Sequence, residues 1–207
     1  MDAEAIGQLF TRGDGSFLCA RWGRPIVPVV FGVQDATLSV IKGAVEAVVA
    51  LAGHQMAQTD PELGANLMVF FVRDWAELRA VPKLDRLIAG LGPLLDRLEA
   101  VEANQYRVFR FDGSGAIRAC FVLLRMDGHL SSVPAETLAL SQAVQSILVW
   151  SDQAFLGCAP LGIVDGLAVL RPEIAGVIRA AYDPALPVMS GDASHALRLA
   201  ARVRAVN

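Results

Sequence analysis

The chain has few charged side chains, few cysteines and few histidines for its length. Asp, Glu, Lys and Arg make up 19% of its 207 residues, against roughly 25% in an average domain. The three cysteines are an odd number, widely spaced, with no Cys-x-x-Cys pair, so their spacing is uninformative, and free thiols are favoured over one disulfide with a leftover thiol. No histidine has another three or four residues away, so no pair could share a metal ion on one helix face.

Long apolar runs and basic clusters are also missing. No segment reaches the ~18 uninterrupted apolar residues of a membrane helix, and Pro28 and Glu46 break the two most apolar runs. The chain begins with acidic residues where a secretory leader would be basic. We therefore expect no transmembrane segment and a cytoplasmic location by default, or a periplasmic or exported one if Met1 replaces a removed leader. The net charge of −3 argues against a nucleic-acid partner.

What the chain does contain is apolar residues, at 54% of the total. Its length suits one domain with a real hydrophobic core. The surplus of apolar over charged residues favours a buried partner surface, such as a homo-oligomer interface, although a bias toward Ala, Val and Leu explains it equally well. The cysteines are expected to be buried free thiols that act as small hydrophobic groups: Cys19, Cys120 and Cys158.

The order of apolar patterns predicts an α+β (α/β-like) fold. Asp35 suits the N-cap of a long helix and Gly53 its C-terminal stop. The stretch 67–72 is too apolar to alternate, which is typical of a central strand covered on both faces. Helices are expected at 2–11, 36–52, 74–80, 83–103, 134–150, 172–182 and 193–203; strands at 16–22, 26–33, 67–72, 106–111 and 116–124; and a loop at 157–166. This predicts a single domain over 1–207 with a mixed central sheet of four to five strands, long helices packed on it, and a helical insertion at about 74–103.

The helix expected over 134–150 is the most informative segment. A zincin carries His-Glu-x-x-His at this point, because residues four apart share a helix face and can ligate one zinc ion. The Glu activates the zinc-bound water. A metzincin adds a glycine three residues later and a third His six residues after the second. In that register this chain has Ser141, Gln142, Gln145, Leu148 and Ser151, so every ligand, the base and the glycine are replaced. No Gly-x-Ser-x-Gly elbow or phosphate loop replaces them elsewhere.

Four short motifs resemble those of an uncharacterised bacterial domain family of zincin-like (metzincin-like) fold, many of whose members are exported. Together they span about residues 16–200, and they are Arg21–Pro25, Leu51–His54, Ala65–Phe71, and Ala181–Pro184 with Leu186. The resemblance implies a zincin-like topology with a degenerate active-site helix. That family tends to keep acidic residues and a Gln-x-Leu-Gly ending on the equivalent helix. Here only Gln145 remains, and Leu148 stands where the glycine would fall.

The resulting hypothesis is a catalytically inactive zincin-like domain that acts as a binding or interaction module for a peptide or protein. No catalytic residue, metal ligand or cofactor is expected. Amides and hydroxyls can bind a peptide backbone without a metal, and an aromatic residue at the end of the helix would lie where a zincin cleft runs. The predicted ligand-binding pseudo-site is therefore Ser141, Gln142, Gln145, Trp150 and Ser151.

Two alternatives stay open. One is a divergent metal-dependent peptidase or other hydrolase, which would need ligands from distant parts of the chain. His54 is expected in a loop near a helix end, His129 in the loop that begins at Asp127, and His195 facing solvent on the last helix, so this alternative is the weaker one. The other alternative is a structural subunit whose apolar surplus is buried in an oligomer.

Overall fold

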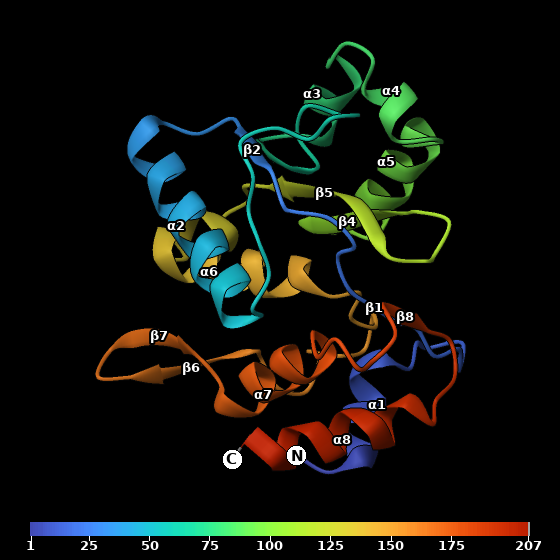
Figure 1. Cartoon of the computed structure of the whole chain (residues 1–207). Helices are drawn as coiled ribbons and strands as arrows, with labels where there is room; N and C mark the ends of the chain where they lie inside the picture. Colours follow the sequence, from blue (N-terminus) through green and yellow to red (C-terminus); the bar gives the residue numbers. More distant parts are fainter. Residues whose placement is uncertain (207) are drawn as a thin grey trace.

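A four-stranded mixed sheet lies between two sets of helices in the computed structural model, which describes residues 1–206 (Figure 1). The strand order is β2 (Pro28–Phe31), β3 (Leu67–Val72), β5 (Ile117–Arg125), β4 (Gln105–Phe111). The first three strands are parallel, and β4 pairs with β5 in the antiparallel direction at one edge. The α+β class and the mixed sheet of four strands are confirmed.

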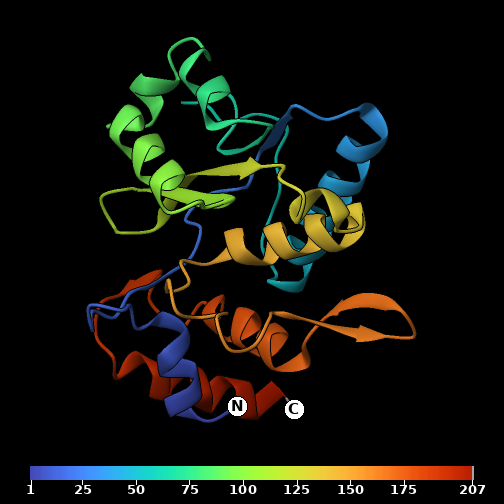
Figure 2. The same cartoon turned by 180° about the vertical axis from the view of Figure 1, so that it is seen from behind.

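Helices cover both faces of the sheet, as the apolar character of β3 predicts. Helices α2 (Asp35–Leu51) and α6 (Ala135–Ile147) pack together on one face. Helices α3 (Trp75–Arg79), α4 (Leu84–Leu87) and α5 (Leu91–Ala100) lie on the other (Figures 1 and 2). Because both faces are covered, β3 and β5 are buried along almost their whole length.

The segment predicted as a helical insertion, at about 74–103, contains all three helices that cover this other face of the sheet: α3, α4 and α5. It begins with a capping box in which Asp74 accepts a hydrogen bond from the Ala76 N–H and Glu77 accepts from the Asp74 N–H. The buried Trp75 side chain then donates its indole N–H to the Ala103 carbonyl at 3.1 Å. One tryptophan thus fixes the start of the segment to its end.

A further group of helices, which we call the third layer, lies below α6 and contains both ends of the described chain. Helices α1 (Ala3–Phe10) and α8 (His195–Val206) lie side by side, and α7 (Pro172–Ala181) packs against α8 (Figures 1 and 2). The short strands β1 (Cys19–Ala20) and β8 (Met189–Ser190) pair in the antiparallel direction. This pairing holds the segment between α7 and α8 to the segment that precedes the sheet. A 3-10 turn over Leu130–Ser132 precedes α6.

The stretch expected as a loop over 157–166 contains part of a β-hairpin, so that expectation is wrong. Strands β6 (Leu161–Val164) and β7 (Leu167–Leu170) pair around Asp165 and Gly166, whose φ angles are 51° and 80°. Two consecutive positive φ values define the tight turn that matches strand twist, and Asp-Gly is a preferred pair for it. The hairpin projects from the body of the molecule (Figure 1).

Three smaller expectations are also wrong. Gln34, not Asp35, is the N-cap of α2, and Asp35 occupies its first turn. Cys158 is exposed because it lies in the loop before β6, whereas Cys19 and Cys120 are buried free thiols. His195 is only 2% exposed, because α8 packs against both α1 and α7.

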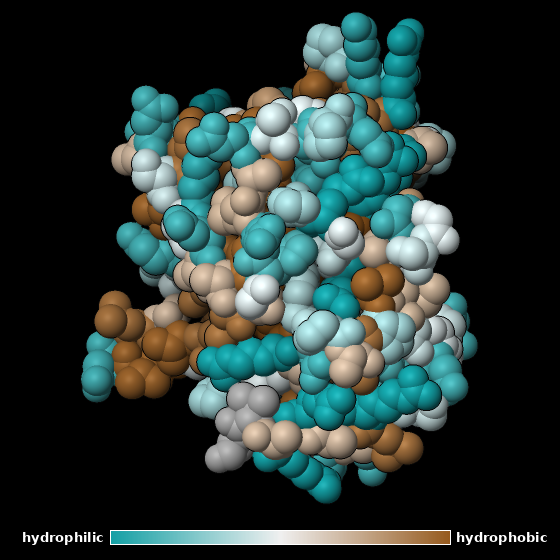
Figure 3. All heavy atoms as spheres, in the orientation of Figure 1, coloured by the Kyte–Doolittle hydropathy of each residue, from teal (hydrophilic) through white to brown (hydrophobic). Residues whose placement is uncertain are grey.

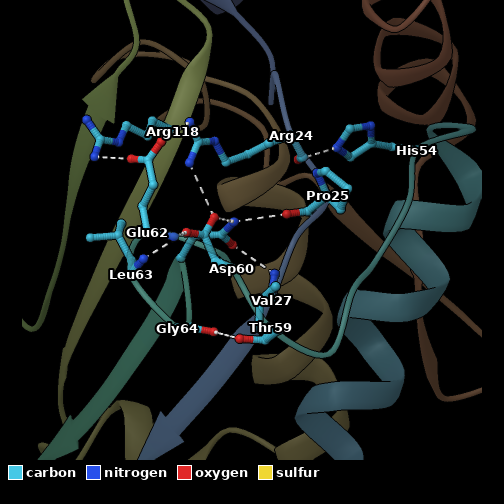
Figure 4. A network of polar contacts seen from close by, with 11 residues as sticks. Arg24, Pro25, Val27, His54, Thr59, Asp60, Glu62, Leu63, Gly64 and Arg118 are labelled. Atoms are coloured by element: carbon cyan, nitrogen blue, oxygen red, sulfur yellow. Dashed lines mark hydrogen bonds and ion pairs between the residues drawn. The ribbon is translucent and has the colours of Figure 1, made fainter.

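A buried polar network ties the start of β2 to the start of β3 (Figure 4). The Asn66 side chain accepts from the Val27 N–H at 2.8 Å and donates to the Pro25 carbonyl and to Asp60. Burial opposes ionisation of Asp60, but backbone N–H groups, Asn66 and Arg24 outweigh it and lower its pKa. Every polar group of Asn66 has a partner, so this cluster is a structural clamp rather than an open site.

Replacing Asn66 by Ala should lower the free energy of unfolding by about 2–4 kcal/mol, because several buried polar groups lose their partners together. The matched control is Asn104→Ala, whose amide bonds one half-buried carboxylate, Asp127. It should cost about 1 kcal/mol or less. Urea denaturation of both variants measures the difference. Equal losses would contradict a clamp role for Asn66.

Candidate functional site

The end of α6 is held by three side-chain donors, of which one follows the helix directly and two come from distant parts of the chain. The last carbonyl groups of a helix have no partner within the helix. Here two indole N–H groups and one phenol hydroxyl replace those partners. The bonds are Trp150 to the Val144 carbonyl (2.8 Å), Trp22 to the Ser146 carbonyl (2.9 Å) and Tyr182 to the Ile147 carbonyl (2.9 Å).

These caps end the helix at Ile147, earlier than the predicted residue 150. Leu148 is extended, with φ −135° and ψ 160°, and it bridges to Arg21 in the antiparallel direction. Val149 donates its N–H to the Ala20 carbonyl at 3.0 Å. Trp150 and Ser151 therefore lie beyond the helix, not on it.

The hydrogen bonds of the five predicted pseudo-site residues go to three different places. Ser141 and Gln145 are half-buried and bond each other, with the Gln145 amide donating to the Ser141 hydroxyl at 2.9 Å. Gln142 is 5% exposed and faces β4, where its Oε1 accepts from Arg107 and its Nε2 donates to Gln105. The structure thus brings Ser141 and Gln145 together and turns Gln142 toward the sheet.

The other two residues belong to the third layer. The Trp150 ring stacks on Phe10 of α1, with centroids 5.2 Å apart and planes 13° apart, and meets the edge of Phe155. The buried Ser151 bonds the backbone of α1 through its N–H to Leu9 and its hydroxyl to Gln8. Both residues anchor α1, and the five do not form one hydrogen-bonded cluster.

A cavity of about 500 Å³ lies instead along the free edge of β4. Its β4 lining consists of residues 106–109 and Phe111, α5 and the turn before it form one wall, and Arg12 and Val149 complete the lining. None of the five predicted residues lines it. Gln142 is connected to the cavity only through its hydrogen bond with Arg107, which is a lining residue. We call this cavity the β4 cleft.

Arg107 is the most unusual side chain of the β4 cleft. It comes from the edge strand, on the face toward α6, and donates from Nη2 to Gln142 and to Gln105. Its Nε is buried and has no hydrogen-bond partner among residues 1–206. Burial lowers the pKa of the guanidinium to about 10, against a small opposing effect of Cys120. The group stays charged at neutral pH although no carboxylate of the described chain pairs with it.

Two further arginines line the β4 cleft. Arg97 on α5 is exposed, donates to the Tyr106 hydroxyl at 3.1 Å and lies 5.6 Å from the centre of that ring. Arg12 follows α1 and is also exposed. The sequence alone does not reveal this set of three arginines. Arg12 and Arg97 are about 85 residues apart and Arg97 and Arg107 about 10, and only the fold brings them together. The one available signal is Arg107 itself, a charge within a strand-like run.

The described residues offer no cluster for a metal ion. Among residues 1–206, no group of three or more His, Cys, Asp or Glu side chains is placed to hold one. Nε2 of His54 lies 2.8 Å from the Arg24 carbonyl, and burial lowers the pKa of this imidazole. His129 is exposed in its loop and His195 is buried at the start of α8, so the three histidines occupy separate surroundings.

Within residues 1–206, no helix combines the length and apolar character required to cross a membrane. Searches with this chain against protein-family models, curated proteins and solved structures found no match.

Replacing Tyr182 by Phe should lower the free energy of unfolding by about 1–2 kcal/mol, because the Ile147 carbonyl and the Trp22 N–H lose a buried partner. The matched control is Tyr106→Phe, whose hydroxyl accepts only from the exposed Arg97. Its expected cost is below about 0.5 kcal/mol. Thermal and urea unfolding measure both, and an equally small loss in Tyr182→Phe would contradict the capping role.

Proposed function

We propose that this chain is a catalytically inactive zincin-like domain that binds an extended peptide segment of a protein partner in the β4 cleft. The observation that carries the proposal is the cleft of about 500 Å³ beside an edge strand that has no neighbouring strand on one side among residues 1–206. That volume lies in the range of ligand-binding pockets. The zincin-like part of the proposal rests on the four sequence motifs, and the packing of α6 on one face of a mixed sheet is compatible with it.

The free edge of β4 supplies the binding chemistry. Alternate residues of an edge strand direct unpaired N–H and C=O groups outward, and an added strand can bond to them. Pro93 and Leu94 on α5 and Phe109 on β4 provide apolar contacts for side chains of such a strand. A peptide bound in this way needs no metal ion and no cleavage.

We assign the predicted pseudo-site residues a supporting role in this binding. Gln142 accepts a hydrogen bond from the lining residue Arg107. Trp150 caps the end of α6 and follows the lining residue Val149. Ser141 and Gln145 satisfy each other where zinc ligands would stand in a zincin. The residues that touch the peptide are then those of β4 and α5.

Proline substitutions on β4 test this binding mode. Neighbouring residues of a strand point their N–H groups to opposite edges, so only one of Val108→Pro and Phe109→Pro removes an N–H from the free edge. The variant that removes an N–H from the free edge should stay folded. It should lose binding of peptides selected from a phage-displayed library of random linear sequences. The other variant should lose stability by about 3 kcal/mol. Backbone amide shifts in NMR spectra locate the peptide on the wild-type protein.

Peptides that bind without perturbing β4, or that bind the folded proline variant as well as the wild type, would contradict this mode. Metal analysis of protein purified without chelator addresses the enzyme alternative. Stoichiometric zinc together with peptidase activity, both lost in His54→Ala or His129→Ala, would favour a divergent hydrolase instead.

A second candidate function is that of a subunit in a homo-oligomer, and the β6–β7 hairpin favours it. Ile163 and Val164 point to opposite faces of the hairpin and are 70% and 55% exposed, and Leu167 is 70% exposed. Figure 3 shows this apolar projection at the lower left of the molecule. A lone two-stranded hairpin is marginally stable in water. Its two free edges suit pairing with the same hairpin of a second copy, whereas the acidic tip residue Asp165 disfavours an anionic membrane.

The double variant Ile163→Ser with Leu167→Ser should convert an oligomer to a monomer, because it removes apolar surface from the projecting tip. Light scattering coupled to size-exclusion chromatography measures the mass. The matched control is Leu197→Ser, an exposed leucine on α8 (64% exposed), which should leave the mass unchanged. A wild-type protein that is monomeric at high micromolar concentration would exclude this second function.

A further inference from the structure

Three arginines line the β4 cleft without a carboxylate partner, in a protein whose net charge is −3. No ion pair of Arg12, Arg97 or Arg107 occurs within the described part of the chain. The positive charge of the cleft is therefore a local feature against an acidic background. Charge of one sign gathered in a concave site attracts ligands of the opposite sign.

Nearby carboxylates are committed to other partners. Asp96 on α5 pairs with Arg79 of α3. Asp14, close to Arg12, accepts from the Ser16 hydroxyl and N–H, which lowers its pKa. Asp152 accepts from the Gly13 N–H and from Gln153. Hydrogen bonds to neutral groups leave Asp14 and Asp152 charged, and the charge of Arg12 contributes to the lowered pKa of Asp14. Within the described chain, the cleft charge that no ion pair compensates is therefore chiefly that of Arg97 and Arg107.

Among the three arginines, Arg107 is expected to gain the most free energy from pairing with an anion. Its side chain is held by two neutral amide oxygens, from Gln105 and Gln142, and its buried Nε has no partner. The residue as a whole is half-buried. A partly desolvated charge without a counter-ion is costly, and pairing it with an anion recovers part of that cost. The two amides also fix the guanidinium, so less freedom is lost when a ligand binds.

We propose that the β4 cleft selects peptides that present carboxylate groups, with Arg107 as the central contact and Arg97 and Arg12 flanking it. This inference rests on the proposed peptide-binding function, because the free edge of β4 supplies the strand pairing and the arginines supply the selectivity. Arginine binds carboxylates through paired N–H donors. The carboxylates come from Glu or Asp side chains or from the C-terminus of the peptide.

Four designed peptides test the selectivity. Three are acetylated, amidated hexapeptides that alternate threonine with glutamate, glutamine or lysine. The fourth is the glutamine peptide with a free C-terminal carboxylate. Backbone and arginine Nε resonances in NMR titrations report both affinity and location. We expect the glutamate peptide to bind at least about tenfold more tightly than the amidated glutamine peptide, and the lysine peptide to bind most weakly.

Arginine variants assign the preference to the cleft. Arg97→Gln and Arg12→Gln change exposed residues and should each reduce the preference for glutamate several-fold without loss of fold. Arg107→Gln should reduce it most. The matched control is Arg198→Gln, an exposed arginine on α8 that does not line the cleft, and it should change nothing. Should Arg107→Gln unfold, the two exposed variants still decide the question.

The possible outcomes separate the two proposals. Equal affinity for the glutamate and glutamine peptides, with shifts in β4, overturns carboxylate selectivity and leaves peptide binding intact. If neither the designed peptides nor peptides from the phage library perturb β4, both proposals fail. Shifts of the arginine resonances with inorganic phosphate, without binding of any peptide, would identify a phosphate site and overturn the inference. Binding of the fourth peptide in preference to its amidated form identifies the C-terminus as the carboxylate source.

Discussion

The capping of the α6 C-terminus is the interaction on which the rest of the arrangement depends. Trp22, Tyr182 and Trp150 precede the sheet, follow α7 and follow α6, respectively, and all three donate to the last carbonyls of one helix. Because these donors lie far apart in the sequence, the bonds join the sheet layer to the third layer. Tyr182 also accepts from the Trp22 N–H, so two of the three capping residues are bonded to each other.

Two consequences follow from where α6 ends. The chain becomes extended at Leu148 and bonds to the segment around Ala20, which places Val149 in the wall of the β4 cleft. The same exit turns Trp150 onto Phe10 and Ser151 onto the backbone of α1. A helix continued to residue 150 would have placed Trp150 on α6. The position of one cap therefore decides which residues can line the cleft.

Charge and hydrogen bonding are distributed differently in the two polar clusters of the molecule. In the network of Asp60 and Asn66 every buried group has a partner, and the result is a clamp between strands. In the β4 cleft, Arg107 is held by amides but keeps an unpartnered Nε and no counter-ion. An incompletely satisfied charge in a concave site is the arrangement that a ligand can complete.

The sequence by itself determined the elements whose local pattern is strong. The run 67–72 is apolar throughout and forms the central strand β3, and Asp112-Gly-Ser-Gly forms the turn between β4 and β5. The absence of a His-Glu-x-x-His motif on this helix can be read directly from Ser141, Gln142 and Gln145. The sequence also contains the Asp165-Gly166 turn signal, but the strands beside it are only four residues long, too short for a clear alternating pattern. Tertiary structure alone decided the end of α6, the burial of His195, and the meeting of Arg12, Arg97 and Arg107 at one strand edge. The physical reason is that local patterns act over a few residues, whereas these features depend on contacts between segments tens of residues or more apart.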